Sequence, residues 1–317
     1  MILRLIERTA VFLVSLVVSS VLVFAFMAVL PGDPARVALG VNASDQAVAD
    51  LRRQFGLDRP LPTQYVDWVG GLLRGDLGTS YVSKAAIGPQ VFDRLQVTLW
   101  LVVAGMIIAL AIAIPAGTIM AARHRKISGL ALSALSQVGV AVPAFLAGIL
   151  LIVIFAVKLG WLPANGWTPP AQDPVMFLRQ LILPALSLGL VQGAVLTRYV
   201  RSAVLDVLRE DYLRTARAKG LRPFQALWRH GLRNAAVPVV TVLGLQLATL
   251  LIGAVVVERV FVIPGLGSLL LDAVSNRDLI IVQDVVMVLV VAVLLVNFVV
   301  DLLYVALDPR LRTGAAR

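Results

Sequence analysis

The sequence predicts an all-α integral membrane protein with six transmembrane helices and an external helical insertion after the first of them. Composition is the first reason: 59% of the 317 residues are hydrophobic, 15% are charged, and the mean hydropathy is +0.91. No single soluble domain of this size needs so much apolar surface. The second reason is that the apolar residues form long continuous runs, which predict helices rather than the alternating strands of a membrane barrel.

The first predicted span covers 2–30, where an uncharged run follows Arg4, Glu7 and Arg8. A secretory signal peptide would have a shorter apolar stretch followed by a cleavage site of small residues. This run is longer and ends in Pro31-Gly32-Asp33-Pro34. An uncleaved first transmembrane helix within 1–30 is therefore the better interpretation.

Segment 31–94 is polar and carries seven basic and seven acidic residues, so its net charge is near zero. Balanced charge is compatible with translocation to the outside of the membrane. Two short helices are expected here, one capped by Ser44 and ending before Gly56, the other ending before Gly75. Neither is big enough to form a core, so their apolar faces must lie on the spans or on the membrane surface. Those faces are Val48, Leu51 and Phe55 in the first helix, and Tyr65, Val66, Trp68, Val69 and Leu72 in the second.

Five further apolar runs form a predicted helical core over 95–307, followed by a tail at 308–317. Each is close to the ~20 residues that cross ~30 Å of hydrocarbon, although the run at 181–197 reaches that length only by extending past Arg198. The runs cover 95–122, 130–157, 181–197, 234–257 and 285–307. Bends or span ends are expected at four prolines in these runs: Pro115, Pro143, Pro184 and Pro238.

The distribution of basic residues predicts that both termini are cytoplasmic. By the positive-inside rule, the cytoplasmic parts are the basic segment 198–233, the cluster of Arg123, Arg125 and Lys126, and the C-terminal Arg310, Arg312 and Arg317. The loops 31–94, 158–178 and 258–284 are then external. The net charge of +10 is attributed to this bias; nucleic-acid binding by 198–233 is the alternative.

The sequence excludes thiol catalysis and cysteine-type zinc sites, and it offers no motif for nucleotide binding and no metal-ligand pattern. There is no Cys, and His124 and His230 have no partner at metal-ligand spacing. There is also no G-x-x-x-x-G-K-[ST] motif. Active transport would therefore draw on an ion gradient or on a separate ATPase. Scarce intramembrane acids weigh against a gradient-driven secondary transporter. Asp301, the one acid in the last run, is expected in a helix-end or inter-subunit hydrogen bond, with a transport carboxylate as the alternative.

Uncharged polar residues near the middle of the spans are the candidates for the translocation pathway. An amide that faced lipid would be costly, so it is expected to face a cavity or another helix. Pathway lining and hydrogen bonding between helices are both open for Ser136 with Gln137, Ser187 with Gln192, and Thr241 with Gln246. The three glutamines, Gln137, Gln192 and Gln246, are the predicted pathway residues.

Segment 198–233 is predicted to fold as a helix, a turn and a second helix. Apolar residues recur at helical spacing from about 200 to 219. Gly220 is the expected stop, because the residue after a helix often needs positive φ. Pro223 suits the first turn of the second helix, whose apolar stripe would be Phe224, Leu227 and Trp228.

Residues 210–221, EDYLRTARAKGL, resemble the coupling-loop (EAA-type) signature of binding-protein-dependent ABC importer permeases, in the variant of the dipeptide/oligopeptide/nickel branch. Arg214-Thr215-Ala216 replaces the EAA triplet, and Arg233 stands where the general motif has a proline. Further segments are similar to the B-type permease of that branch and occur in order on the six-span plan: LPGDP at 30–34, FGLDRP at 55–60, RGDLG at 74–78, ERVF at 258–261, PGLG at 264–267 and RD at 277–278.

The resemblance implies a type I ABC importer permease fold in a bacterial cytoplasmic membrane. It also implies a homologous second permease that shares the pathway, two cytoplasmic ATPase subunits and an extracytoplasmic solute-binding protein. ATP and Mg would belong to the ATPases, so this chain would be no enzyme, would hold no cofactor and would bind lipid rather than nucleic acid. The expected solute is a di- or oligopeptide; nickel, glutathione and an opine-like compound are alternatives.

The resemblance assigns two sets of site residues. Docking onto an ATPase is expected of Glu210, Asp211, Tyr212, Arg214, Thr215, Ala216, Arg217, Ala218, Lys219, Gly220 and Leu221. The second set is external, and it is expected to contact the binding protein or shape an outer gate, with a re-entrant turn packed on the spans as the structural alternative. Its members are Glu258, Phe261, Pro264, Gly265, Gly267, Arg277 and Asp278.

Overall fold

The computed structural model describes residues 2–30, 33–40, 43–124 and 126–307. Within these ranges every regular element is a helix, and the one other pairing is an isolated antiparallel bridge between Thr79 and Ala86. Several residues used in the sequence interpretation lie outside the described ranges: Pro31, Gly32, Arg125 and the tail 308–317 with Arg310, Arg312 and Arg317.

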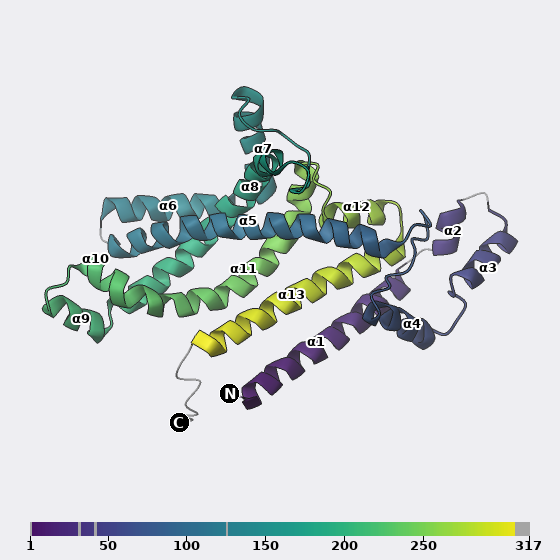
Figure 1. Cartoon of the computed structure of the whole chain (residues 1–317), viewed down its shortest axis with the longest axis horizontal. Coiled ribbons are helices and arrows are strands. Elements are labelled where there is room, and N and C mark those ends of the chain that lie inside the picture. Colours follow the sequence, from purple (N-terminus) through teal and green to yellow (C-terminus); the bar gives the residue numbers. More distant parts are fainter. Residues whose placement is uncertain (1, 31–32, 41–42, 125, 308–317) are drawn as a thin grey trace. The chain divides into compact units, whose positions relative to one another are not determined.

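Five of the described helices are long and apolar enough to cross a membrane (Figure 1). They are α1 (Ile2–Val29), α5 (Ile87–Ala122), α8 (Pro174–Leu208), α11 (Leu232–Val260) and α13 (Leu279–Leu307). A sixth span results if α6 (Ile127–Ala141) is counted together with α7 (Ala144–Leu151) and the π-helix η1 (Ile152–Lys158). The all-α class and the six-span plan are thus confirmed.

The third apolar run is bent at Pro143, which confirms the bend or span end expected at this proline. The axes of α6 and α7–η1 differ by 99°. Val142 has an extended backbone, with ψ 122°, because a following proline disfavours the α-helical conformation. Pro143 also lacks the N–H that would continue the helical hydrogen bonds. Pro115, Pro184 and Pro238 instead lie inside α5, α8 and α11, which continue past them.

Several helices begin earlier or end later than the hydropathy runs predicted. α5 begins at Ile87 rather than 95, α8 covers Pro174–Leu208 rather than 181–197, and α13 begins at Leu279 rather than 285. Hydropathy marks the apolar part of a helix, whereas its hydrogen bonding continues through polar turns beyond that part. The predicted loop 258–284 also contains a further helix, α12 (Leu266–Ser275).

The chain forms two compact units. Unit 1 comprises Met1–Ile6, Leu99–Ile263 and Val296–Arg317; unit 2 comprises Glu7–Thr98 and Pro264–Leu295.

Unit 1 is organised around α8, which packs against α6, α7 and α11. Glycines let α5 approach it closely. A Cβ added to Gly117 of α5 would lie 2.7 Å from Cβ of Val200, and one added to Gly189 of α8 would lie 2.5 Å from Cγ2 of Ile108. Real Cβ contacts are longer than this, so larger residues would push the two helices apart.

Unit 2 has an apolar core where the start of α5, α12 and the start of α13 meet. The backbone N–H of Leu266 also donates to Oγ1 of Thr98 at 2.9 Å, which ties the first turn of α12 to α5. The buried core residues are Ile87, Val91, Leu266, Leu269, Ala273, Ile281, Val282 and Val285.

The described part of the insertion 31–94 belongs to unit 2 and contains both predicted helices, α3 (Asp45–Gln54) and α4 (Leu61–Leu73). Oγ of Ser44 accepts a hydrogen bond from the backbone N–H of Ala47, which confirms the predicted cap. Gly56 and Gly75 have φ of +68° and +78°, as expected for residues that end helices. A third helix, α2 (Pro34–Leu39), was not predicted, and it is capped by Asp33.

The apolar face of α4 packs against the first span, as predicted for a helix too small to have its own core. The ring of Phe24 in α1 lies 5.4 Å from the ring of Tyr65 and 6.1 Å from that of Trp68. Oγ of Ser20 in α1 and the hydroxyl of Tyr65 also share a hydrogen bond of 2.8 Å.

Candidate functional site

The segment 198–233 contains two helices separated by a turn, but the first break comes earlier than predicted (Figure 1). α8 ends at Leu208, the chain turns at Arg209 and Glu210, and α9 occupies Asp211–Ala218. A single helix over 200–219 is therefore a wrong prediction. The stop at Gly220, with φ +94°, and the new helix at Pro223, where α10 (Pro223–Ala226) begins, are confirmed.

The break before α9 allows the side chains of Val207 and Leu213 to lie at the same buried position, next to Gly231. If Gly231 carried a Cβ, that atom would lie 3.0 Å from Cγ1 of Val207 and 3.5 Å from Cδ1 of Leu213. In one continuous helix, residues six positions apart point about 120° away from each other. The turn at Glu210 removes that constraint. Leu213 is consequently 1% exposed and anchors α9.

The second half of the segment is continuous with the fifth span. α10 leads into the π-helix η2 (Leu227–Gly231), and η2 leads directly into α11. A Cβ on Gly231 would lie 2.7 Å from Cδ1 of Leu227, so glycine is required for this tight contact. The predicted coupling segment is therefore a short helix, α9, held between the ends of two long ones.

Polar contacts add to the anchoring of α9. Nδ2 of Asn234 donates to the hydroxyl of Tyr212 at 2.9 Å, which joins α9 to the first turn of α11. Oγ1 of Thr215 donates to the carbonyl of Asp211 at 3.0 Å. The Arg214–Asp211 pair is exposed, at 3.3 Å, and exposed pairs of this kind contribute about 0.3–0.5 kcal/mol.

The outer face of α9 is open and basic. Ala216 and Leu221 are half-buried, and the other predicted coupling residues are exposed: Glu210, Asp211, Tyr212, Arg214, Thr215, Arg217, Ala218, Lys219 and Gly220. Among the described residues, none has an atom within 4 Å of where a Cβ on Gly220 would lie. α9 thus has one buried anchor and an accessible cationic surface.

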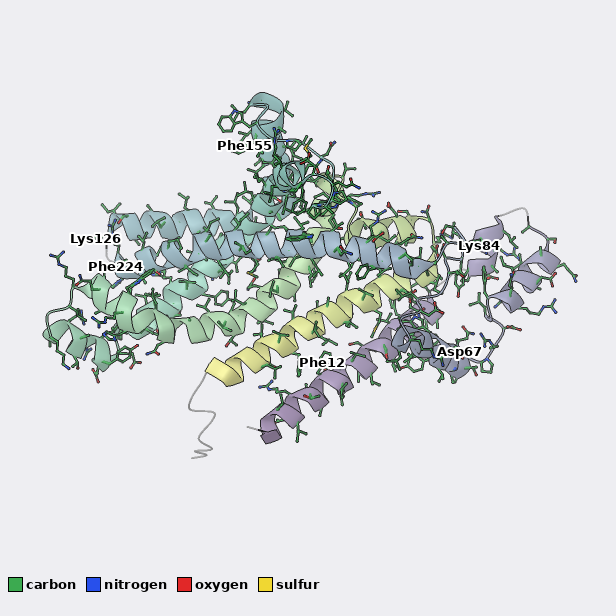
Figure 2. All side chains as sticks on the ribbon, in the orientation of Figure 1. Phe12, Asp67, Lys84, Lys126, Phe155 and Phe224 are labelled. Carbon is green, nitrogen blue, oxygen red and sulfur yellow. The ribbon has the colours of Figure 1, made fainter. Side chains whose placement is uncertain are left out.

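The predicted apolar stripe of the second helix is divided between the interior and the surface. Leu227 is buried, whereas Phe224 and Trp228 are 60% and 66% exposed and stack with their ring centres 6.2 Å apart. Figure 2 shows Phe224 on α10, the helix that follows α9 in the chain. Two exposed aromatic rings therefore accompany the basic face of α9.

Two of the three predicted pathway glutamines meet each other. Nε2 of Gln192 in α8 donates to Oε1 of Gln246 in α11, and both residues are buried. The alternative of hydrogen bonding between helices is thus realised for this pair. Gln137 lies exposed on α6, and its neighbour Ser136 donates to the carbonyl of Ala194 at 2.8 Å. Lining of a pathway stays a prediction for all three.

The remaining polar candidates lie on α8 and α11. Ser187 is buried and donates to the carbonyl of Pro184 in its own helix, at 2.8 Å, whereas Thr241 is exposed. Asp301, in the last turns of α13, is half-buried.

The predicted external signature, which runs from Glu258 to Asp278, is divided between the two units. Its first part lies in unit 1, at the C-terminal end of α11. Glu258 and Phe261 are buried, and the carbonyl of Glu258 accepts from the N–H of Ile263 at 2.8 Å. Between Phe261 and Ile263 lies Val262, which is exposed and has φ +52°. A β-branched residue rarely adopts this left-handed conformation, so the turn is strained.

The second part of the signature forms the two ends of α12 in unit 2. Gly265 is the residue before the first turn, and Gly267 is buried in that turn. At the other end Arg277 has φ +54°, and the N–H of Asp278 donates back to the carbonyl of Ala273 at 2.9 Å. The Asp278 carboxylate then accepts from the hydroxyl of Ser80 and from the N–H of Tyr81, at 3.4 Å for the latter. Arg277 and Asp278 therefore connect α12 to the insertion.

A buried carboxylate close to this connection was missed in the sequence. Asp284 is fully buried at the start of α13, and its Oδ1 accepts from Nε1 of Trp68 at 2.8 Å. Its Oδ2 has no hydrogen-bond partner among the described residues. The sixth span was predicted to begin at 285, one residue too late to include this acid.

The phenol of Tyr81 also responds to this environment. Burial raises the pKa of Tyr81 to about 12, and the nearby carboxylates of Asp284 and Asp278 add to the effect.

Comparison with known proteins gives consistent matches over nearly the whole chain. Residues 113–313 match the family described as "Binding-protein-dependent transport system inner membrane component", and residues 1–102 match "Binding-prot-dependent transport system membrane comp, N-term". The chain is 42% identical over 311 residues to the glutathione transport system permease protein GsiC of Escherichia coli O6:H1, covering 97% of this chain and 98% of that protein. It is 43% identical over 302 residues to GsiC of Salmonella typhimurium strain LT2, covering 94% and 95%.

A solved structure shares the fold. The MetNI methionine ABC transporter in an inward-facing conformation contains a chain that superposes with a TM-score of 0.55 at 20% identity. The superposition covers 69% of this chain and 96% of the other. At this identity the likeness concerns the fold alone, which agrees with the predicted type I permease architecture.

Proposed function

This chain belongs to the family of binding-protein-dependent transport system inner membrane components, and we propose that it forms half of the translocation pathway of an ATP-driven glutathione importer. At the coarser level it is a multi-pass permease subunit of a bacterial ABC importer, which works with ATPase, binding-protein and partner-permease subunits. ATP hydrolysis takes place in the partner subunits, so the chain is not an enzyme.

The observation that carries the proposal is the geometry of α9. This short helix is anchored by buried Leu213 between the ends of α8 and α11, and it exposes a basic face. A segment held in this way moves together with the two spans, whereas a flexible loop would absorb the motion. We assign Glu210 to Leu221 as the contact with an ATPase, in which acidic groups pair with Arg214, Arg217 and Lys219.

The subunit composition follows from the same family. A homologous second permease would supply the other half of the pathway, and each permease would engage one of two ATPase subunits that bind ATP and Mg. A solute-binding protein would deliver cargo from outside. In this arrangement both termini are cytoplasmic and the 31–94 insertion faces the binding protein.

Glutathione replaces the broader class of di- and oligopeptides as the proposed solute. The relatives named glutathione permease are more than 40% identical over nearly the whole chain, and this favours the glutathione alternative among those left open by the sequence. Glutathione is itself a tripeptide, so the proposal stays within the peptide branch.

The remaining candidates receive positional roles in this scheme. Gln192 and Gln246 would face the pathway when the spans move apart and their mutual hydrogen bond opens. The strained turn at Val262, between buried Phe261 and Ile263, together with Glu258, would contribute to an outer gate. Pro264, Gly265, Gly267, Arg277 and Asp278 would support it by fixing the ends of α12.

Uptake by the reconstituted complex tests the proposal. Proteoliposomes that contain both permeases and both ATPases, with ATP inside and binding protein outside, should accumulate labelled glutathione. Uptake should stop when the ATPases carry a hydrolysis-blocking substitution, and it should persist when ion gradients are collapsed. Uptake that survives the ATPase substitution but needs an ion gradient would overturn the importer mechanism, and uptake of other peptides but not of glutathione would overturn the solute.

A further inference from the structure

Unit 2 contains a cavity of about 640 Å³ whose walls come from the end of α1, the insertion and the start of α13. Sites for small molecules commonly have 300–1,000 Å³. The walls are partly aromatic, with Phe24, Phe55, Trp68 and Tyr81 among the lining residues. The cavity is therefore of a size to hold a tripeptide.

Both signs of charge line this cavity. Arg52 and Arg59 provide the cationic groups, and Asp33, Asp67 and Asp76 provide the anionic ones. Arg59 is already engaged: its Nη1 lies 2.6 Å from Oδ2 of Asp67, and its guanidinium lies over Gly56. The groups left for a ligand are thus those of Arg52 and Asp76.

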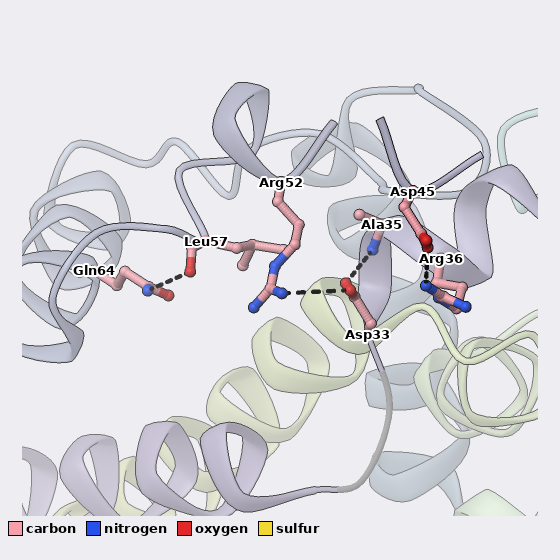
Figure 3. Close-up of polar contacts among 7 residues, drawn as sticks. All are labelled: Asp33, Ala35, Arg36, Asp45, Arg52, Leu57 and Gln64. Atoms are coloured by element: carbon pink, nitrogen blue, oxygen red, sulfur yellow. Dashed lines mark hydrogen bonds and ion pairs between the residues drawn. The ribbon is translucent and has the colours of Figure 1, made fainter. Parts of the chain in front are cut away.

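Arg52 is only loosely paired. Its Nη1 lies 3.7 Å from Oδ2 of Asp33, which is too long for a hydrogen bond, and its side chain is 52% exposed (Figure 3). Asp33 itself is occupied at Oδ1, which accepts from the N–H of Ala35 at 3.0 Å. The Arg52 guanidinium accordingly keeps its planar set of donors for a carboxylate.

Asp76 is the complementary anion. Its Oδ1 accepts from the N–H of Gly78 at 2.8 Å, which fixes the carboxylate, and among the described residues its Oδ2 makes no hydrogen bond. Tyr81 also lines the cavity, and its protonated phenol adds no charge of its own.

We propose that this cavity binds a zwitterionic peptide of about three residues, with its carboxylate on Arg52 and its ammonium group on Asp76. The inference rests on the proposed function, because it gives the imported solute a second site on the permease itself. Solute released by the binding protein would be held here, at the ends of α1 and α13, before it passes between the spans. Aromatic walls then contact the apolar parts of the peptide without selecting one side chain.

The chain supplies a matched control for the test. Arg53 follows Arg52 on α3, yet it pairs with Asp50 and does not line the cavity. Binding of labelled glutathione is measured on the assembled permease–ATPase complex without the binding protein, for the wild type, Arg52→Gln and Arg53→Gln. Arg52→Gln is expected to raise the Kd at least tenfold, since a charge-assisted contact is lost, whereas Arg53→Gln should stay within twofold of the wild type.

A second measurement varies the ligand instead of the protein, so it does not depend on how the variants fold. On the wild-type complex, the dimethyl ester of glutathione and N-acetyl glutathione should each bind at least tenfold more weakly than glutathione. The ester lacks both carboxylates, either of which could bind Arg52, and the N-acetyl derivative lacks the ammonium group that would pair with Asp76. Equal binding of glutathione and its ester would overturn the proposal. So would equal Kd values for Arg52→Gln and Arg53→Gln, or no binding of glutathione in the absence of the binding protein.

The two proposals fail in different ways. If the liposomes take up glutathione while Arg52→Gln binds as well as Arg53→Gln does, the cavity is not a solute site and the transport function stands. If glutathione binds to the complex in an Arg52-dependent manner but is not taken up, the cavity site stands and the proposed solute is wrong.

Discussion

Leu213→Ala tests whether the rigid attachment of α9 is needed for coupling. Leu213 is the only fully buried side chain described within α9, and it packs beside Val207 and Gly231. Truncating a buried leucine to alanine costs about 2–5 kcal/mol. A helix of eight residues is marginal without packing, so most of this cost falls on the docking of α9 rather than on the spans. At about 2.8 kcal/mol, the ratio of docked to undocked α9 falls roughly 100-fold.

The assay compares solute transport with ATP hydrolysis in the same proteoliposomes. We expect Leu213→Ala to lower the amount of solute imported per ATP at least fivefold, because an undocked α9 follows the ATPases without moving α8 and α11. Leu135→Ala is the matched control, since Leu135 is 73% exposed on α6 and has little packing to lose. Its transport per ATP should equal that of the wild type.

An unchanged ratio in Leu213→Ala, in a complex that assembles normally, would refute this reasoning. It would mean that α9 transmits motion through its contact with the ATPase alone, whatever holds it to the spans. If the ATPase subunits were lost from the complex, the variant would instead have weakened the binding of the ATPases to the permease. Co-purification of the subunits distinguishes this outcome from a loss of coupling.

Three further predictions concern residues away from α9. Gln192→Leu and Gln246→Leu should each lower the free energy of unfolding by about 1–3 kcal/mol, because each leaves a buried amide unpaired, and the double variant should regain most of this loss. If the double variant is stable but takes up no solute, the pair has a pathway role. If it is stable and takes up solute, the role of the pair is structural. Val262→Gly should leave the melting temperature unchanged or higher, because glycine removes left-handed strain of about 1–2 kcal/mol, whereas Val256→Gly inside α11 should lower it. Trp68→Phe should lower the melting temperature by leaving the buried Asp284 carboxylate without its donor, a cost of about 1–3 kcal/mol, while Trp161→Phe at an exposed position should not.

Sequence signals predicted much of the fold where the structure depends on interactions between residues close together in the chain. Ser44 caps α3 through a residue three positions away, and Gly220 ends α9 through its own φ. Proline at 223 likewise begins a helix without help from distant residues. The long apolar runs predicted six spans for a similar reason, since crossing hydrocarbon depends on composition over about 20 consecutive residues.

Features set by distant contacts were not predictable in this way. The break before α9 depends on the packing of Leu213 and Val207 beside Gly231, which no periodicity within 200–219 reveals. Trp68 and Asp284 are separated by 216 positions in the chain. The cavity likewise combines residues from three separate stretches, so its charges could be counted in the sequence but not brought together.

The continuity of α8 has a consequence for how the chain tolerates changes in length. Gln192 and Leu208 lie on the same uninterrupted helix, separated by about 24 Å at 1.5 Å per residue. One residue inserted between them would turn α9 by about 100° around the axis of α8 and point its basic face in a new direction. The same insertion at 159–173, outside any helix, would change no such angle. The number of residues between Gln192 and α9 therefore sets the direction in which the basic face of α9 points.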